Sequence, residues 1–370
     1  MIGWEDVYKV VVEIAPLYVA LMLGYGSVKW WRIFTPEQCE AINRLVYYFT
    51  YPFFVFEFTA HVDPFKMNYL FMAADAISKV IIVVVLGCWA RWCSNSSKGS
   101  YCWSITTFSL STLTSSLVVG VPFLNAMYGH MAVDLVVQSS VFQALVWLTI
   151  LLFVFEVRRT RNDQRNILVL DHHQSSAADH QNHAVVMNDS EIQQQNDDAV
   201  GSRPSISVWK LMKEVCLKLA KNPNSYACVL GLAWASLSNR LHFEMPSIIE
   251  GSILIMSRAG TGTAMFSMGL FMAAQKTVIA CGASLTIFGM ALRFIAGPLA
   301  MALGSLAVGL HGDVLRIAII QAALPQSITS FIFAKEYGLH ADVLSTAVIF
   351  GMIVCLPVLI GYYAILDFVH

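Results

Sequence analysis

The sequence predicts an all-α protein that crosses a membrane many times. Of its 370 residues, 57% are hydrophobic and only 13% are charged, whereas a globular domain usually carries about 25% charged residues. Apolar runs such as Leu145–Phe155 and Val343–Tyr363 recur along the chain, and a helix needs roughly 20 apolar residues to cross a bilayer. A soluble domain is therefore excluded.

Ten membrane spans are expected, in two sets of five on either side of a polar segment. Their approximate ranges are 10–28, 40–60, 68–90, 102–127, 133–156, 225–240, 250–275, 280–308, 314–334 and 341–366. Pro36 and Pro246 open the second and seventh spans, because proline suits the first turn of a helix. The domains are thus a first five-helix repeat over 1–156 and a second over 207–370.

The segment 157–206 between the repeats has a different composition. It is rich in Gln, Asn, Asp, His and Ser, so it lacks the apolar content that offsets ordering entropy and is expected to be a disordered loop. Its histidines give no clear metal motif, and neither a metal nor a cofactor is expected. Val208–Lys221 is predicted to be a basic amphipathic helix at the membrane surface.

The distribution of Lys and Arg orients the chain. Arg158, Arg159 and Arg161 leave the fifth span, and Lys218 and Lys221 approach the sixth. Positive charge marks the cytosolic side, so the central loop is expected in the cytosol and both termini outside or in a lumen. The net charge of −1 gives no basis for a nucleic-acid partner.

The two halves of the chain resemble each other at an offset of about 210 residues. Leu113–Leu117 corresponds to Leu324–Ile328, and Tyr128–Asp134 corresponds to Tyr337–Asp342. Each half holds five expected spans, and two similar halves with an odd number of spans must be inverted relative to each other. Inverted repeats are typical of secondary transporters that bind substrate near the membrane midplane and work by alternating access.

The fourth and ninth spans are predicted to be broken helices. Pro325 lies in the middle of the ninth span, and Gly120 and Pro122 follow a run of hydroxyl residues, Thr114–Ser116, in the fourth. Unwound backbone at membrane depth is tolerated where it lines a cavity. Two half-helices beginning there direct their N-terminal dipoles at a common point, which is an anion site without a cationic side chain. A structural kink filled by hydroxyls is the alternative.

Charged and amide side chains inside the spans are the other candidates. Asp75 and Lys79 share one face of the third span, either as a charge switch near the substrate or as a self-neutralising pair. Arg293 lies in the eighth span, the repeat partner of the third. Gln143 and Gln326 are able to donate to a carboxylate. An apolar and aromatic wall suits a flat aromatic ligand or plain helix packing, and consists of Tyr51, Phe53, Phe54 and Val55.

Several stretches are similar to the PIN-FORMED auxin efflux carriers of plants, in their short-loop form. The resemblance covers both membrane halves. Its most specific stretches are Ala15–Ala20, Phe34–Cys39, Met265–Ala273, Gln321–Gln326 and Phe333–Tyr337.

The resemblance implies a fold like that of sodium/proton antiporters and bile-acid transporters, with ten helices and crossing helices four and nine. It also implies a homodimer in membrane lipid that carries indole-3-acetate and related aromatic carboxylates. Asp75 and Lys79 match a supporting charge pair. By motif position, the substrate-binding residues are Thr50, Tyr51, Val55, Ser115, Val118, Gln143, Pro325, Gln326 and Ile328.

One motif departs from the family. Thr114 and Ser115 stand where the family has Pro-Asn in the fourth helix, whereas Pro325 and Gln326 keep the form of the ninth. Ser115 offers a single hydroxyl and loses the paired donor and acceptor of an amide.

The leading hypothesis is a secondary carrier that moves the auxin anion across the endoplasmic reticulum membrane, which would contribute to intracellular auxin homeostasis. The short loop favours this location over the plasma membrane, the alternative. Two other functions stay open: a proton- or ion-coupled transporter of another organic anion, and a membrane auxin receptor. An enzyme is not expected, because the sequence has no GxSxG or HExxH motif.

Overall fold

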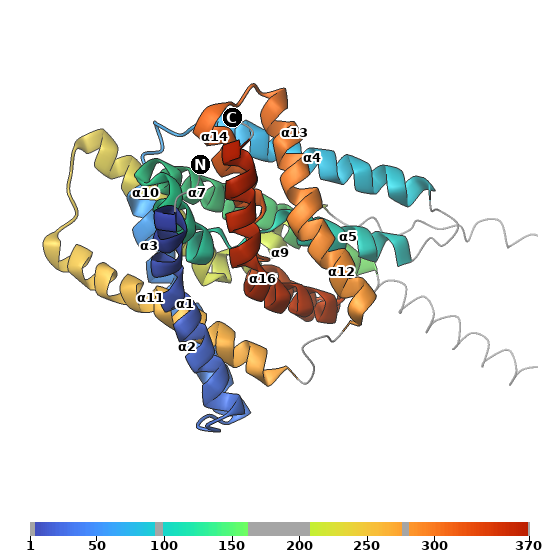
Figure 1. Ribbon diagram of the computed structural model, residues 1–370, viewed down its shortest axis with the longest axis horizontal. Helices are drawn as coiled ribbons and strands as arrows, with labels where there is room; N and C mark the ends of the chain where they lie inside the picture. The colour runs from blue at the N-terminus through green and yellow to red at the C-terminus, as the bar shows by residue number, and fades with distance from the viewer. Residues whose placement is uncertain (1–3, 93–98, 162–207, 276–280, 369–370) are drawn as a thin grey trace, which may run out of the picture. The chain divides into compact units, whose positions relative to one another are not determined.

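The computed structural model describes residues 4–92, 99–161, 208–275 and 281–368 (Figure 1). Contacts divide the chain into two compact units, one formed by Met1–Leu148 with Lys221–His370 and the other by Thr149–Ala220. The described residues are almost entirely helical, and apart from helices they form one isolated β-bridge. The expectation of an all-α protein with several membrane spans is confirmed.

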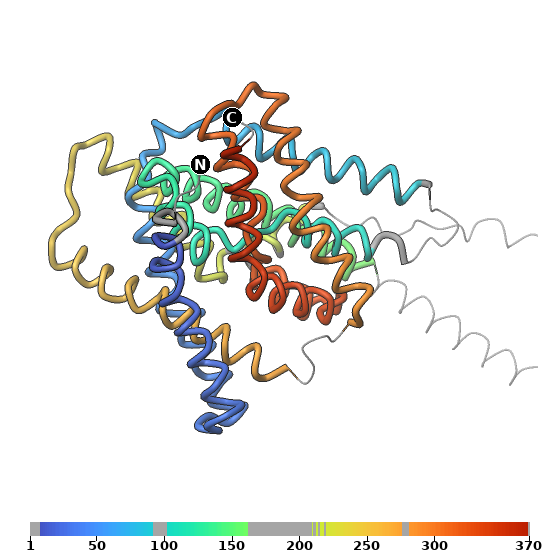
Figure 2. Tube along the Cα trace, in the orientation of Figure 1, coloured from blue at the N-terminus to red at the C-terminus, as the bar shows by residue number. Residues whose placement is uncertain are grey.

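The first unit contains the candidate site. Its α-helices are α1 (Trp4–Lys29), α2 (Pro36–Leu45), α3 (Tyr51–Ala60), α4 (Tyr69–Trp92), α5 (Gly99–Thr112), α6 (Val121–Tyr128), α7 (His130–Phe142), α10 (Pro223–Leu241), α11 (Ser247–Ala274), α12 (Ala283–Ala291), α13 (Gly297–Ala307), α14 (Gly312–Ala322), α15 (Ile328–Glu336) and α16 (Ala341–Phe368). Four π-helical turns join some of them: η1 (Val46–Thr50), η2 (Ser116–Gly120), η3 (Gln143–Trp147) and η4 (Leu292–Ala296). Figure 2 follows the same chain as a continuous trace.

The described part of the second unit is also helical. It holds residues 149–161 and most of α9 (Val208–Lys221), so a helix forms where the basic amphipathic segment was expected. Helix also continues to Arg161, a little past the boundary expected at residue 156, because apolar residues give way to arginines gradually there. The rest of the expected loop, with His172, His173, His180 and His183, lies outside the described residues.

Five helices in the described residues are long and apolar enough to cross a membrane. They are Tyr8–Lys29, Tyr69–Arg91, His130–Arg161, Ala283–Ala307 and Ala341–Phe368, which match the first, third, fifth, eighth and tenth expected spans. The second is one continuous helical stretch through α2, η1 and α3, the fourth and ninth are interrupted by non-helical residues, and α10 and α11 occupy the sixth and seventh. The total of ten spans stays a prediction.

Local sequence signals explain where several helices begin and bend. Pro36 opens α2 as expected, inside a capping box in which the Gln38 N–H donates to Thr35 Oγ1 at 3.3 Å and the Thr35 N–H donates to Gln38 Oε1 at 3.0 Å. Pro298 follows η4 and cannot donate to the carbonyl of Phe294. The Tyr362 hydroxyl donates to that carbonyl instead.

The main helix contacts of the first unit fall into two groups. The scaffold group consists of α1, α2–η1–α3, α10 and α11, and the crossing group consists of α4, α5–η2–α6, α7–η3, α12–η4–α13 and α14–α16. Within the scaffold group α1 and α11 touch backbone to backbone, since a Cβ added at Gly269 would lie 2.0 Å from the Leu21 carbonyl oxygen. Each group therefore packs internally, and the candidate site lies where they meet.

Candidate functional site

Two interrupted helices pair with each other through their unwound residues. After α5 ends at Thr112 and α14 ends at Ala322, Thr114 and Gln326 form an antiparallel β-bridge. The Ser115 N–H donates to the Pro325 carbonyl at 2.9 Å, and the Ser327 N–H donates to the Leu113 carbonyl at 3.2 Å. The backbone N–H and carbonyl groups that lose their helical hydrogen bonds at the breaks therefore find partners in the opposite break.

Arg293 holds the helix ends that precede these breaks. Its guanidinium is fully buried and donates to four backbone carbonyls. The bonds run from Nε to Leu324 at 2.5 Å, from Nη2 to Ala322 at 3.0 Å, and from Nη1 to Leu113 at 3.2 Å and Leu110 at 3.3 Å. The sequence showed a charge inside a span and gave no sign of these partners.

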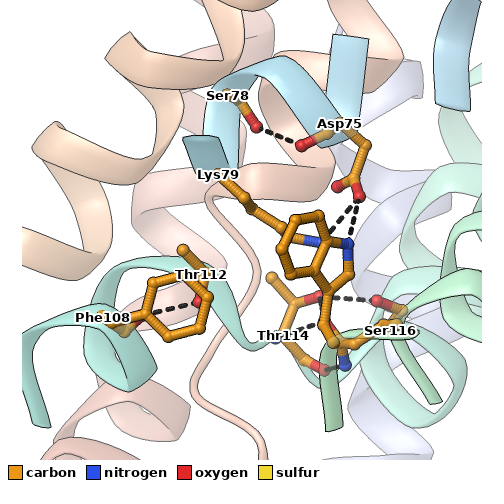
Figure 3. Close-up of polar contacts among 9 residues, drawn as sticks. Asp75, Ser78, Lys79, Phe108, Thr112, Thr114 and Ser116 are labelled. Atoms are coloured by element: carbon orange, nitrogen blue, oxygen red, sulfur yellow. Dashed lines mark hydrogen bonds and ion pairs between the residues drawn. The ribbon is translucent and has the colours of Figure 1, made fainter. Parts of the chain in front are cut away.

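Gln143, on η3, holds the unwound backbone of the fourth span. Its Oε1 accepts from the Thr114 N–H at 3.0 Å and from the Thr114 hydroxyl at 3.2 Å, and its Nε2 donates to the Thr114 carbonyl at 2.9 Å. The Thr114 hydroxyl also lies 2.7 Å from the hydroxyl of Ser116 (Figure 3). The Gln143 amide therefore keeps only one N–H for any ligand.

Asp75 and Lys79 form the buried ion pair that their spacing predicts. Lys79 Nζ lies 2.7 Å from Asp75 Oδ2, and the Trp147 indole N–H donates to the same oxygen at 3.2 Å. Figure 3 shows the pair beside the Thr114 segment. Both residues line a small cavity of about 20 Å³, which Thr114 and Gln321 also line.

The main cavity has a volume of about 300 Å³ and lies between the scaffold group and the crossing group. The expected site residues that line it are Tyr51, Val55, Ser115, Val118, Gln143 and Ile328. The scaffold group adds residues of α10 and α11, among them Cys228 and Met268. The cavity therefore has an aromatic and aliphatic side facing a side built from unwound backbone.

Three expected site residues do not line this cavity. The Thr50 hydroxyl lies 3.1 Å from the hydroxyl of Thr263 on α11, and Pro325 contributes its carbonyl to the paired breaks. Gln326 is fully buried, and its Nε2 donates to the Ser109 carbonyl at 3.0 Å and to Ser330 Oγ at 2.6 Å. In this structure the three residues therefore take part in helix packing and in the pairing of the breaks.

Some polar lining residues were not predicted. Asn43 and Ser267 line the cavity and bond to each other, with Ser267 Oγ donating to Asn43 Oδ1 at 2.6 Å, and Asn222 and Thr329 line it as well. For Asn43, Ser267 and Thr329 the signal available was a polar side chain inside an apolar span, and Asn222 lies outside the expected spans. In the described part of the chain, no group of three or more His, Cys, Asp or Glu side chains is placed to hold a metal ion.

Comparison with known proteins gives the family. A model of the family described as "Membrane transport protein" matches residues 9–363. "Auxin efflux carrier component 5" of Arabidopsis thaliana is 64% identical over 370 residues, and "Probable auxin efflux carrier component 5a" of Oryza sativa subsp. japonica is 60% identical over 370 residues, each match covering 100% of both chains. "Auxin efflux carrier component 8" of Arabidopsis thaliana is 39% identical over 369 residues, covering 99% of this chain and 100% of its own.

These relatives match this chain from end to end, without a long insertion at the central loop. The chain belongs to the membrane transport protein family and, within it, to the short-loop PIN-FORMED auxin efflux carriers.

Proposed function

We propose that this protein is a secondary carrier of the auxin anion, indole-3-acetate, and of related aromatic carboxylates. The observation that carries the proposal is the cavity at the paired breaks, where two helices begin without a side-chain cap. The N-terminal residues of η2 and α15, among them Ser116, Leu117, Ile328 and Thr329, line this cavity. The first N–H groups of a helix have no partner within it, so they are donors for a carboxylate.

The charges around the cavity favour a single negative charge on the ligand. In the described residues of the first unit, the buried charged side chains are Asp75, Lys79 and Arg293. Asp75 and Lys79 neutralise each other. Arg293 meets the C-terminal ends of α5 and α14, each of which carries roughly half a negative charge. The two N-terminal ends, together roughly one positive charge, then stay unbalanced and face the cavity.

The other wall of the cavity suits an aromatic ring. Tyr51, Val55 and Phe271 line it from the scaffold group, and a volume of about 300 Å³ lies at the small end of the range for ligand sites, roughly 300–1,000 Å³. Indole-3-acetate combines a flat ring with one carboxylate. The names of the relatives, which call them auxin efflux carriers, support this choice.

Ser115 lines the cavity at the place where the family has asparagine. Its hydroxyl supplies one donor, whereas an amide supplies a donor and an acceptor together. We therefore expect weaker binding of the carboxylate than an asparagine at this position would give.

The proposed mechanism is alternating access by two inverted five-helix repeats, 1–156 and 207–370. Its support is the position of the cavity between the scaffold group and the crossing group, with paired breaks in Leu113–Leu117 and Leu324–Ile328, which correspond in the two halves. Movement of the crossing group against the scaffold group would expose the site to one side at a time. No ATP is required, since the chain has no phosphate-binding loop motif.

The proposed location is the endoplasmic reticulum membrane, with the central loop in the cytosol and both termini in the lumen. The short loop and the lysines and arginines that flank it support this. A homodimer, as in the resemblance, belongs to the same proposal. The plasma membrane is the alternative location.

Uptake of labelled indole-3-acetate into liposomes holding the purified protein tests the function. Val118→Trp fills the cavity, and Val83→Trp makes the same change on an α4 side chain that is 51% exposed and lines no part of the cavity. We expect saturable uptake by the wild type and by Val83→Trp, and little by Val118→Trp. Uptake that is equal in all three proteins would remove the cavity from the transport path.

A second candidate function is ion-coupled transport of another organic anion. The observation that favours it is the small cavity of about 20 Å³ beside Asp75 and Lys79, which has room for one water molecule that could relay a proton to the pair. Asp75→Asn should then abolish the pH dependence of uptake. Uptake that still depends on pH in this variant would contradict proton coupling through Asp75. A membrane auxin receptor would bind the ligand in the same assay without transporting it.

A further inference from the structure

The side chain of Arg293 joins two segments that lie far apart in the sequence. Two of its acceptors, Leu110 and Leu113, belong to the end of α5 and its break, and the other two, Ala322 and Leu324, belong to the end of α14 and its break. The last carbonyls of a helix lack partners within the helix. A single planar guanidinium, with donors in a fixed fork, therefore caps two helices at once.

We propose that Arg293 is the positioning residue of the anion site. It does not line the main cavity, so it does not touch the ligand. It fixes the ends of α5 and α14 relative to each other. Because the paired breaks follow directly, this also fixes the positions of the first residues of η2 and α15. Because the inference concerns where those N–H groups point, it rests on the proposed function.

The helix that carries Arg293 is itself held against both partners. A Cβ added at Gly297, one turn after Arg293, would lie 2.6 Å from the Ser111 carbonyl oxygen, so η4 and α13 touch the backbone of α5. The hydroxyl of Tyr362, on α16, donates to the Phe294 carbonyl beside Arg293. The backbone that carries the guanidinium is therefore held in place by contacts with α5 and α16.

Arginine has a second effect that lysine reproduces only in part. The two C-terminal helix ends each carry roughly half a negative charge and would repel each other at this short separation. A lysine keeps the compensating charge, but its single ammonium cannot reach four carbonyls in the geometry of a fork. Arg293→Lys is therefore expected to fold while losing the register of the breaks.

The test compares two ligands of the same shape. The dissociation constants of indole-3-acetate and of its neutral amide, indole-3-acetamide, are measured for the purified full chain. In Arg293→Lys we expect the value for the carboxylate to rise about tenfold, equivalent to one charge-assisted hydrogen bond. The value for the amide should change by less than about twofold, since the aromatic wall binds it. Arg44→Lys, on the exposed face of α2, is the matched control and should leave both unchanged.

Tyr362→Phe supplies a milder variant in case Arg293→Lys does not fold. It removes a hydrogen bond to η4 without changing the cavity or the breaks. Because this is a weaker, neutral hydrogen bond, we expect the dissociation constant of the carboxylate to rise about threefold and that of the amide to stay the same. A loss that is equal for both ligands, or no loss in either variant, would overturn the positioning role while leaving the carrier in place. A wild type that binds neither ligand would overturn the proposed function and this inference with it.

Discussion

Gln143 offers the sharpest test of how the broken fourth span is held. In Gln143→Leu a side chain of similar size loses the three hydrogen bonds to Thr114. The Thr114 hydroxyl keeps its contact with Ser116 at 2.7 Å, but the Thr114 N–H and carbonyl are left without their partner.

The magnitude follows from these two backbone groups. A buried polar group left without a partner costs about 1–3 kcal/mol. Thr114 lines both cavities, so water is able to replace part of each bond, and we expect a loss of about 2–3 kcal/mol in the free energy of unfolding. The matched control is Gln138→Leu, another buried glutamine, on α7 just before η3, whose Oε1 accepts one bond, from the Asn68 N–H at 2.9 Å. One lost bond predicts about 1 kcal/mol.

Unfolding of both variants in detergent, followed by tryptophan fluorescence, measures the difference, and ligand binding is measured in parallel. Gln143→Leu should be the less stable variant and should bind indole-3-acetate more weakly, since the break that Gln143 holds leads into the N-terminus of η2. Gln138→Leu should bind normally. Equal stability of the two variants, or full affinity in Gln143→Leu, would show that Gln143 does not hold the break of the fourth span.

Three further predictions concern the ligand, the charge pair and the scaffold. Ser115→Asn should strengthen indole-3-acetate binding by about 1 kcal/mol for one added hydrogen bond, and an unchanged dissociation constant in a folded variant would mean that this residue does not touch the ligand. Lys79→Met should lower the free energy of unfolding by about 3–5 kcal/mol, because it leaves the buried Asp75 carboxylate without its cation. Adding Asp75→Asn should restore much of this stability, and a double variant as unstable as the single one would contradict the pairing. Gly269→Ala should destabilise by about 1–3 kcal/mol, since its Cβ would lie 2.0 Å from a carbonyl oxygen of α1, whereas Gly87→Ala meets nothing within 4 Å and should be neutral or slightly stabilising. Thermal unfolding of the two glycine variants side by side decides that point, and equal melting would count against close packing of α1 on α11.

Much of this site was accessible from the sequence because the relevant signals are local. A spacing of four residues put Asp75 and Lys79 on one helix face, and Pro325 marked a break that the structure contains. Nine residues were expected to bind substrate from the resemblance to the auxin efflux carriers, and six of them line the cavity.

What sequence reasoning missed depends on contacts between distant segments. The four carbonyls bound by Arg293 come from two helix ends, one of them about 180 residues away, which no periodicity reveals. Gln326 carries the same amide as Gln143, yet it donates to Ser109 and Ser330 and does not line the cavity. Side-chain direction is set by the packing of the crossing group, so residue type alone did not separate a cavity residue from a pairing residue.

The most direct test of the central claim is an experimental structure of the protein with indole-3-acetate bound, in lipid. We expect the carboxylate within hydrogen-bond distance of the first N–H groups of η2 and α15, near Ser116 and Ile328, with the indole ring against Tyr51 and Val55. A carboxylate bound directly to Lys79, or a ligand outside the main cavity, would contradict it.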